Sequence, residues 1–247
     1  PEILSTSSQN HLRISATFTA EPLRGPLAFL LDTLGLGHRV SFADYGQVLQ
    51  EALDPSSESS RNPAGGMNVF LIRPSDLGEA LAETGQAIAA LAVRSVATQL
   101  VILCPDQSPV ADLTPLTSPL SGLANVDLVT DAELAAFYPV ADIFDPESDA
   151  SGHIPYTETI FVAAATRIVR ALSLRSRPPV KVLALDADNT LWGGVCGEDG
   201  ATGIQLEGPY RALREFALAK RREGLLLVLV SKNQEADVDR VFAERAD

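Results

Sequence analysis

Two aspartates, Asp186 and Asp188, stand directly after a short apolar run, residues 182–185. The run predicts a buried β-strand, so the aspartates fall where that strand ends. Ligands of parallel α/β sheets bind at this carboxyl edge. A carboxylate in that place can attack a phosphoryl or acyl-phosphate group, and a second one two residues on can transfer protons. The alternative is that both side chains are ordinary loop or cap carboxylates.

A glycine-rich segment and a second apolar run follow these aspartates. Glycines at 193, 194, 197 and 200 predict an irregular, turn-rich segment that contains Cys196. The second run, residues 225–230, ends in Ser231, Lys232 and Asn233, ahead of a helix predicted over 234–246. Ser231 is a candidate N-cap of that helix, and the backbone N–H groups at a helix N-terminus favour an anion.

These motifs carry a resemblance to a known family. The pattern Asp186-x-Asp188-x-Thr190-Leu191 resembles motif I of the haloacid dehalogenase (HAD) superfamily. The longer run through Trp192-Gly-Gly-Val-Cys196-Gly-Glu-Asp-Gly200 resembles one branch of it, the FkbH-like domains. Such domains occur in polyketide and nonribosomal peptide biosynthesis. Many of them take a glyceryl unit from 1,3-bisphosphoglycerate and load it onto an acyl carrier protein.

The resemblance implies a role for each matching side chain. Asp186 matches the nucleophile, which takes the phosphoryl group or holds the metal against it. Asp188 matches the general acid/base, and its backbone carbonyl would also face the metal. Ser231 matches the phosphate-binding hydroxyl of motif II, and Thr190 is the other candidate phosphate-binding residue. Two close carboxylates and a phosphorylated substrate need a cation, and this hard oxygen site suits Mg²⁺.

Cys196 separates the FkbH-like branch from plain phosphatases. In glyceryl-loading members the acyl unit rests on an enzyme cysteine as a thioester, and as a thiolate Cys196 would be the better acyl acceptor. Asp186 would then serve mainly in metal binding and phosphate handling. The alternative is that Cys196 is a small buried residue without chemistry. Cys104 ends an apolar run and is expected in the core.

The first part of the chain resembles the domain that precedes the HAD part in FkbH-like proteins, which is similar to the SGNH-hydrolase fold. Residues 15–23, 45–50 and 152–156 carry this resemblance. The Gly-Asp-Ser nucleophile motif of active SGNH enzymes is absent, and Asp149 lies four residues before His153 rather than three. We therefore predict a non-catalytic domain used for docking or binding, with His153 tied down at a helix start. The alternative is a hydrolytic pair of His153 with Thr17 or Ser15.

The order of predicted elements gives the architecture. Strands at 12–18, 39–42, 68–72, 99–103 and 127–130 alternate with helices at about 17–34, 44–53, 77–94, 131–137 (with Asp131 as a possible cap) and 156–174. This alternation predicts an α/β, doubly wound parallel sheet of SGNH/flavodoxin-like type over 1–174. Residues 1–10 are a polar lead-in, 54–66 a loop, 105–122 irregular and 175–180 a proline-stiffened linker. Residues 181–247 are expected to form the N-terminal part of a Rossmann-like HAD domain, because the later lysine and acidic motifs do not follow.

The composition of the chain limits the classes of partner that it can bind. The chain of 247 residues has 19 Lys and Arg against 32 Asp and Glu, for a net charge of −13, which argues against nucleic acid and anionic membranes. No run approaches the roughly 18 apolar residues that span a bilayer. No signal-peptide pattern is visible, and the two distant cysteines indicate reduced thiols in a cytoplasmic protein. The helix predicted at 209–222 is basic, and it either docks an acidic carrier protein or is an ordinary solvated face.

Three functions stay open from the sequence. The first is an FkbH-like glyceryl transferase and phosphatase that uses 1,3-bisphosphoglycerate and loads an acyl carrier protein. The second is a generic HAD phosphatase. The third is a catalytically silent, carrier-binding or structural module of a synthase.

Overall fold

The structure is a computed structural model that describes residues 10–176 and 180–245. It divides into two compact units, Pro1–Arg177 (unit 1) and Pro178–Asp247 (unit 2). The predicted lead-in lies outside the described residues except for Asn10, which begins the first strand. The central part of the predicted linker, residues 177–179, also lies outside them.

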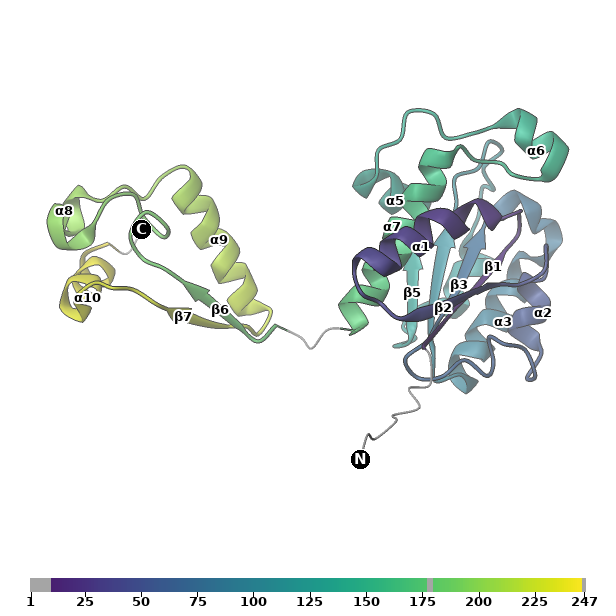
Figure 1. The fold of residues 1–247 in the computed structure, drawn as a ribbon, viewed down its shortest axis with the longest axis horizontal. Coiled ribbons are helices and arrows are strands. Elements are labelled where there is room, and N and C mark those ends of the chain that lie inside the picture. Colours follow the sequence, from purple (N-terminus) through teal and green to yellow (C-terminus); the bar gives the residue numbers. More distant parts are fainter. Residues whose placement is uncertain (1–9, 177–179, 246–247) are drawn as a thin grey trace. The chain divides into compact units, whose positions relative to one another are not determined.

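Unit 1 is built on a five-stranded sheet in the order β2-β1-β3-β4-β5. Each neighbouring pair is parallel (Figure 1). The strands are β1 (Asn10–Ala16), β2 (His38–Phe42), β3 (Met67–Ile72), β4 (Thr98–Leu103) and β5 (Val126–Val129). The predicted α/β fold with a doubly wound parallel sheet is confirmed.

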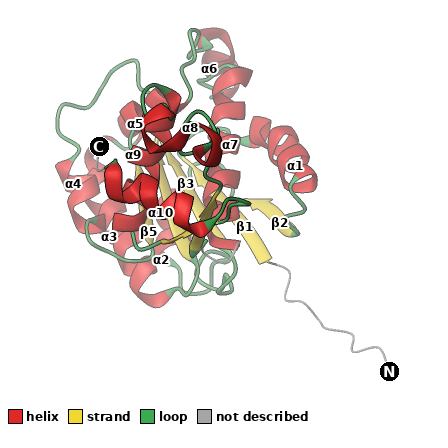
Figure 2. Cartoon of the chain, turned by 90° about the vertical axis from the view of Figure 1, so that its left-hand side faces the viewer, coloured by secondary structure: helices red, strands yellow, loops and turns green. Residues whose placement is uncertain are grey.

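Helices cover both faces of this sheet (Figure 2). Because side chains alternate along a strand, Val69 and Leu71 of β3 face one core while Phe70 and Ile72 face the other. The first core includes α1 (Arg24–Thr33) and α7 (Glu158–Ser176). The second includes α2 (Val48–Leu53), α3 (Leu81–Arg94) and α4 (Thr114–Thr117). Cover on both sides explains why the middle strand, β3, is apolar at every position except Asn68.

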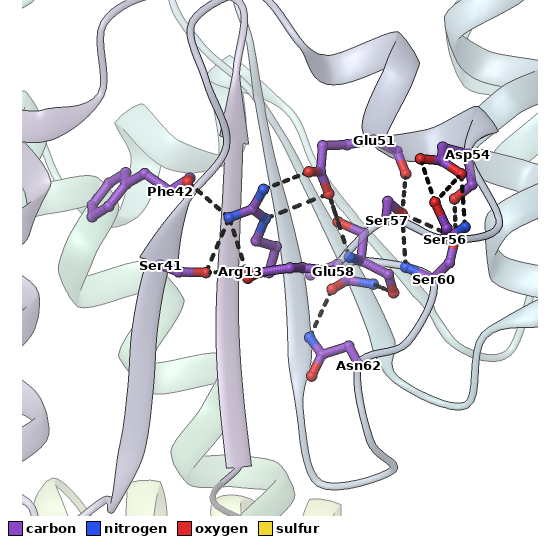
Figure 3. Close-up of polar contacts among 12 residues, drawn as sticks. Arg13, Ser41, Phe42, Glu51, Asp54, Ser56, Ser57, Glu58, Ser60 and Asn62 are labelled. Carbon is purple, nitrogen blue, oxygen red and sulfur yellow. Dashed lines mark hydrogen bonds and ion pairs between the residues drawn. The ribbon is translucent and has the colours of Figure 1, made fainter.

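A buried polar network ties the predicted loop 54–66 to the sheet (Figure 3). Arg13 of β1 pairs with Glu51 of α2 and, at 3.0 Å, with Glu58. Its Nη1 also donates to the Phe42 carbonyl at 2.8 Å. The Ser59 hydroxyl donates to the same Glu51 carboxylate at 2.7 Å. These contacts provide partners for the buried guanidinium of Arg13, next to the edge strand, and they order a loop that has no regular structure.

Several helices of unit 1 differ from their predicted bounds for local reasons. The helix predicted at 77–94 begins as 3₁₀ turns at Pro74–Asp76 and Gly78–Ala80, because Gly78 adopts a positive φ of 53° that no α-helix continues. The helix predicted at 17–34 likewise starts with a 3₁₀ turn, Glu21–Leu23. The helix predicted at 44–53 is shortened to α2.

Other differences concern helix ends. Helix α5 (Asp131–Phe137) has the predicted bounds, but Thr130 rather than Asp131 caps it, in a capping box with Glu133. Helix α6 (Pro146–Gly152) was not predicted. Helix α7 continues to Ser176, two residues into the predicted linker. The segment predicted as irregular, 105–122, contains α4 and a 3₁₀ turn at Ser118–Leu120.

Unit 2 contains a parallel pair of strands, β6 (Val182–Leu185) and β7 (Leu226–Leu229). Its helices are α8 (Cys196–Gly203), α9 (Pro209–Arg222) and α10 (Glu235–Glu244), and Figure 1 shows α8 beside α10. Trp192 is 2% exposed and forms the centre of a small separate core. Helix α8 lies in the glycine-rich segment, where only turns were predicted, and it is kinked at Gly200.

The strands of unit 2 are not buried, and that prediction was wrong. Val182 is 47% exposed and Leu226 is 62% exposed. On α9, Phe216 is 50% exposed, and Ala217 is buried. Two strands without further neighbours bury little of their surface, and the described helices leave these apolar side chains uncovered.

Candidate functional site

The carboxyl ends of β6 and β7 meet because the strands are parallel and in register, with Leu185 opposite Leu229. The residues that follow each strand line one cavity of about 440 Å³. Its lining residues are Asp186, Asp188, Val230, Ser231, Lys232 and Asn233. The structure thus brings together three of the predicted site residues from segments more than forty positions apart.

Asp186 presents an accessible carboxylate to this cavity. It lies directly after β6 and is exposed. Its Oδ1 accepts the N–H of Ala187 at 2.8 Å. Within the described part of the chain no other hydrogen bond to its carboxylate occurs, so Oδ2 is available to a ligand.

Asp188 is held by three N–H donors. Its Oδ1 accepts from Trp192 Nε1 at 2.9 Å and from the Cys196 backbone N–H at 3.1 Å. Its Oδ2 accepts from Asn233 Nδ2 at 2.8 Å. Burial alone would raise the pKa of Asp188, but these donors outweigh it and the pKa is lowered. Asp188 is therefore a fixed carboxylate that stays charged at neutral pH, and its lowered pKa makes it a weak base.

The loop after Asp188 has a backbone that glycine makes possible. Asn189 adopts a left-handed conformation, φ 54°, and its Oδ1 accepts the Gly194 N–H at 3.1 Å, which holds the loop. Gly194 has φ 101°. A Cβ at Gly193 would lie 2.7 Å from the Tyr210 ring. Thr190 lies in the same turn but is not among the residues that line the cavity.

Cys196 lies beside the cavity and not in its lining. It begins α8 and is 3% exposed. Its Sγ accepts a hydrogen bond from Asn233 Nδ2 at 3.2 Å. Burial raises the pKa of the Cys196 thiol, and the negative charge of Asp188 and its hydrogen bond to the thiol raise it further. The resting group is therefore a thiol, which must lose its proton to become the better acyl acceptor.

Asn233 is the site residue that sequence reasoning missed. Its side-chain amide contacts both the Asp188 carboxylate and the Cys196 sulfur. Its position two residues after Ser231 was the available signal. The backbone N–H of Asn233 donates to Ser231 Oγ at 3.2 Å, while the residue that caps α10 is Gln234. Ser231 is therefore not the N-cap, and its hydroxyl proton can turn to a ligand in the cavity.

The atoms of this cavity that could bind a metal ion are oxygens. Among the residues that the structure describes, no three His, Cys, Asp or Glu side chains gather as they do around a metal held by protein alone. Asp186 offers its free carboxylate oxygen, whereas both carboxylate oxygens of Asp188 already accept N–H groups. Mg²⁺ commonly takes only one or two protein oxygens and completes its shell with water and substrate phosphate. The residues present fit that mode of binding.

The basic face predicted on α9 is largely neutralised. Arg214 donates to the Leu206 carbonyl at 2.9 Å, which makes it part of the packing of unit 2. Arg211 pairs with Glu207 and Glu215, and Lys220 pairs with Glu223. Arg221 and Arg222 stay exposed. Exposed ion pairs within one helix are typical of an ordinary solvated face, and docking of a carrier protein on this helix stays a prediction.

In unit 1, His153 does not form a hydrolytic pair. It lies at the end of α6 with φ 52°, not at a helix start as predicted. No hydrogen bond joins it to Thr17 or Ser15 over residues 10–176. The Thr17 hydroxyl accepts the Arg73 backbone N–H at 2.9 Å, and Ser15 is 1% exposed. The His153 ring instead has Nε2 at 3.1 Å from Arg73 Nη2 and Nδ1 at 3.3 Å from Asp149 Oδ1.

Comparison with known proteins bears on the fold. No protein-family profile matches the chain, and no curated protein matches it in sequence. A solved structure, the N-terminal part of the protein BF1531 from Bacteroides fragilis, is similar with a TM-score of 0.66 and 18% sequence identity. The similarity covers 96% of this chain and 72% of that one. That structure is described as containing a phosphatase domain complexed with Mg.

At this level of identity the similarity establishes a shared fold. The chain therefore has an α/β fold, with a five-stranded parallel sheet flanked by helices, that it shares with a protein containing a phosphatase domain.

None of the described helices combines the length and apolar composition needed to cross a membrane.

Proposed function

We propose that unit 2 is a HAD-type, Mg²⁺-dependent phosphatase site of the FkbH-like kind, which transfers a glyceryl unit from 1,3-bisphosphoglycerate to an acyl carrier protein. The observation that carries this proposal is the cavity at the ends of β6 and β7, where Asp186, Asp188 and Ser231 meet. Asn233 joins this cavity to the Cys196 thiol. A plain phosphatase site has no need of that thiol.

The cation site rests on the free carboxylate oxygen of Asp186 and the backbone carbonyl of Asp188. These oxygens would hold Mg²⁺ together with water and the substrate phosphate, and the ion would neutralise phosphate charge. Ser231 and the N-terminal N–H groups of α10 support the phosphate from the other strand end. The Mg reported for the similar Bacteroides fragilis structure supports this assignment.

The acyl transfer uses the thiol and the carboxylate that lie beside each other. Asp188 accepts the thiol proton of Cys196, and the sulfur attacks the carbonyl carbon of the acyl phosphate. An S–C bond forms, the C–O bond to the phosphate breaks, and phosphate leaves. The thiol of the carrier protein then attacks the thioester and returns Cys196 to its thiol form. Asp188 faces the thiol as a charged carboxylate, but its lowered pKa and the raised pKa of Cys196 both oppose full proton transfer, so the proton moves as the sulfur attacks and not beforehand.

The test is intact-protein mass spectrometry of the full chain after incubation with 1,3-bisphosphoglycerate and Mg²⁺, with phosphate release measured in parallel. We expect an added glyceryl unit, with or without its phosphate, on the wild type. The adduct should be absent in Cys196→Ala and retained in Cys104→Ala, since Cys104 is a buried thiol of unit 1 that serves as the matched control. Asp186→Asn should lower the rate of phosphate release by about tenfold or more.

Each other outcome counts against a stated part of the proposal. Phosphate release that survives Cys196→Ala, with no adduct on the wild type, indicates a generic phosphatase. Neither adduct nor phosphate release from a folded chain indicates a silent, carrier-binding module. An adduct that persists in Cys196→Ala places the acyl group on another residue and removes the thiol from the mechanism.

A further inference from the structure

Asn233 makes a pair of contacts that phosphate binding in unit 2 does not require. It lies four residues after β7 and two residues before α10, and it is half-buried. Its Nδ2 donates to Asp188 Oδ2 at 2.8 Å and to Cys196 Sγ at 3.2 Å. One side-chain amide therefore joins three segments, which are the end of β7, the turn after β6 and the start of α8.

The chemistry of these contacts identifies the donating atom. A charged carboxylate oxygen only accepts hydrogen bonds, so the amide nitrogen of Asn233, and not its oxygen, faces Asp188. That nitrogen carries two N–H groups, and the two contacts use one each. Leucine has a similar shape but no donor, and a charged aspartate has the same shape with acceptors only. An amide at position 233 therefore suits both partners at once.

Each partner of Asn233 has a second anchor. Asp188 Oδ1 accepts from Trp192 Nε1 at 2.9 Å and from the Cys196 backbone N–H at 3.1 Å, while Asn233 holds Oδ2. The Cys196 backbone is thus fixed by the carboxylate, and the Asn233 amide fixes the direction of its sulfur. The Asn233 backbone N–H donates to Ser231 Oγ at 3.2 Å. Carboxylate, sulfur and amide form one closed set of hydrogen bonds.

Packing in unit 2 keeps this set together. Cys196 at the start of α8 and Val238 of α10 belong to the same buried cluster as Trp192. Helices α8 and α10 contact each other, and Figure 1 shows them side by side. Because Asn233 directly precedes the α10 cap and Cys196 begins α8, the packing of these two helices determines the distance between the amide and the sulfur.

We propose that Asn233 is a positioning residue of the acyl transfer, which fixes the Cys196 sulfur against the Asp188 carboxylate. This inference rests on the proposed function, in which the thiol proton moves to Asp188 as the sulfur attacks. The step needs sulfur, carboxylate and acyl carbon in one arrangement, and a misplacement of about 1 Å can lower a rate by about 100-fold. Substrate binding, which rests on Asp186 and Ser231, does not use the Asn233 side chain.

The first test follows adduct formation on the full chain by intact-protein mass spectrometry, at several concentrations of 1,3-bisphosphoglycerate with Mg²⁺. Asn233→Leu and Asn233→Asp should lower the rate constant at saturation by roughly tenfold or more and leave the half-saturating concentration unchanged. Gln205→Leu is the matched control, since Gln205 is an exposed amide side chain of unit 2 outside the cavity lining, and it should keep both values.

The outcomes separate this inference from the proposed function. An adduct that forms on the wild type and on both Asn233 variants at the same rate overturns the positioning role alone. A raised half-saturating concentration with an unchanged rate constant overturns it as well, since that result places Asn233 in substrate binding. No adduct on the folded wild type overturns the proposed function and the positioning role together.

A second test needs no substrate. The side-chain ¹H–¹⁵N signals of Asn233 report its two N–H groups separately. Cys196→Ala should shift one of these two proton signals, because the acceptor of that N–H is lost, while the side-chain signals of Gln205 stay in place. If neither Asn233 proton shifts in the folded Cys196→Ala variant, the contact with the sulfur is not made and the proposal fails.

Discussion

His11 is a buried titratable side chain whose charge the fold disfavours. Its Nε2 lies 2.7 Å from Ser41 Oγ, and its Nδ1 lies 3.4 Å from Arg39 Nη2. Burial lowers the pKa of His11, and the nearby charge of Arg39 lowers it further, against an opposing effect of Glu58. The folded chain therefore takes up this proton at a lower pH than the unfolded chain does.

We predict a stability change of unit 1 from this difference. The unfolded chain binds the proton near pH 6.5, the ordinary value of the histidine. The free energy of unfolding should therefore fall as the pH drops below 6.5, and this fall should stop below the folded pKa. Urea unfolding followed by far-UV circular dichroism between pH 7.5 and 5 measures it. His11→Gln should flatten this slope, and His38→Gln should keep it. A slope unchanged by His11→Gln would falsify the assignment.

Helix α5 shows how one cap defines an element. Thr130 accepts the N–H of Glu133 at 3.2 Å, and the Glu133 carboxylate accepts the N–H of Thr130 at 2.9 Å. Asp131, which we expected as the cap, instead accepts the N–H of its neighbour Ala132. The Glu133 carboxylate accepts hydrogen bonds from the Thr130 backbone N–H and from the Thr130 hydroxyl, and these two bonds, the first one most, lower the pKa of Glu133.

Thr130→Ala should destabilise unit 1 by about 1 kcal/mol, and Asp131→Ala should have a smaller effect. Because the folded pKa of Glu133 is lowered, its contribution is present above the unfolded value of 4.5 and is lost as the pH falls through the folded pKa. Urea unfolding at pH 7 and at pH 3 should show the difference between Glu133→Gln and wild type shrinking at the lower pH. An effect of Asp131→Ala larger than that of Thr130→Ala contradicts the capping box.

The molecule as a whole consists of two units with separate cores. Unit 1 buries residues on both faces of five strands. Unit 2 has a small core around Trp192 and leaves apolar side chains such as Leu226 and Val230 exposed. Units with independent cores unfold independently, and the one that buries less apolar surface is the less stable.

We expect unit 2 to unfold first. Trp192 is the only tryptophan of the chain, and it is buried in unit 2, so its fluorescence reports that unit alone. The midpoint of the fluorescence transition should lie at a lower urea concentration than the midpoint of the main transition in circular dichroism, to which both units contribute. Hydrogen exchange should be faster at the backbone amides of β6 and β7 than at those of β3 and β4. A single coincident transition by both probes would mean that the units unfold together.

The sequence by itself determined the type and order of most elements, because these depend on local periodicity and on where apolar runs stop. It also placed Asp186, Asp188 and Ser231 in one site, since parallel strands bring their carboxyl ends to one edge. The parallel sheet of unit 1 followed from the same alternation of strands and helices.

Only the tertiary structure decided what surrounds each group. The three donors on Asp188, the amide of Asn233 between Asp188 and Cys196, and the protonated thiol arise from segments that are distant in the chain. Burial of the strands of unit 2 also failed to follow from their apolar sequence, because burial depends on what packs against a strand. Local patterns specify the backbone, whereas long-range contacts determine the charge and accessibility of the side chains on it.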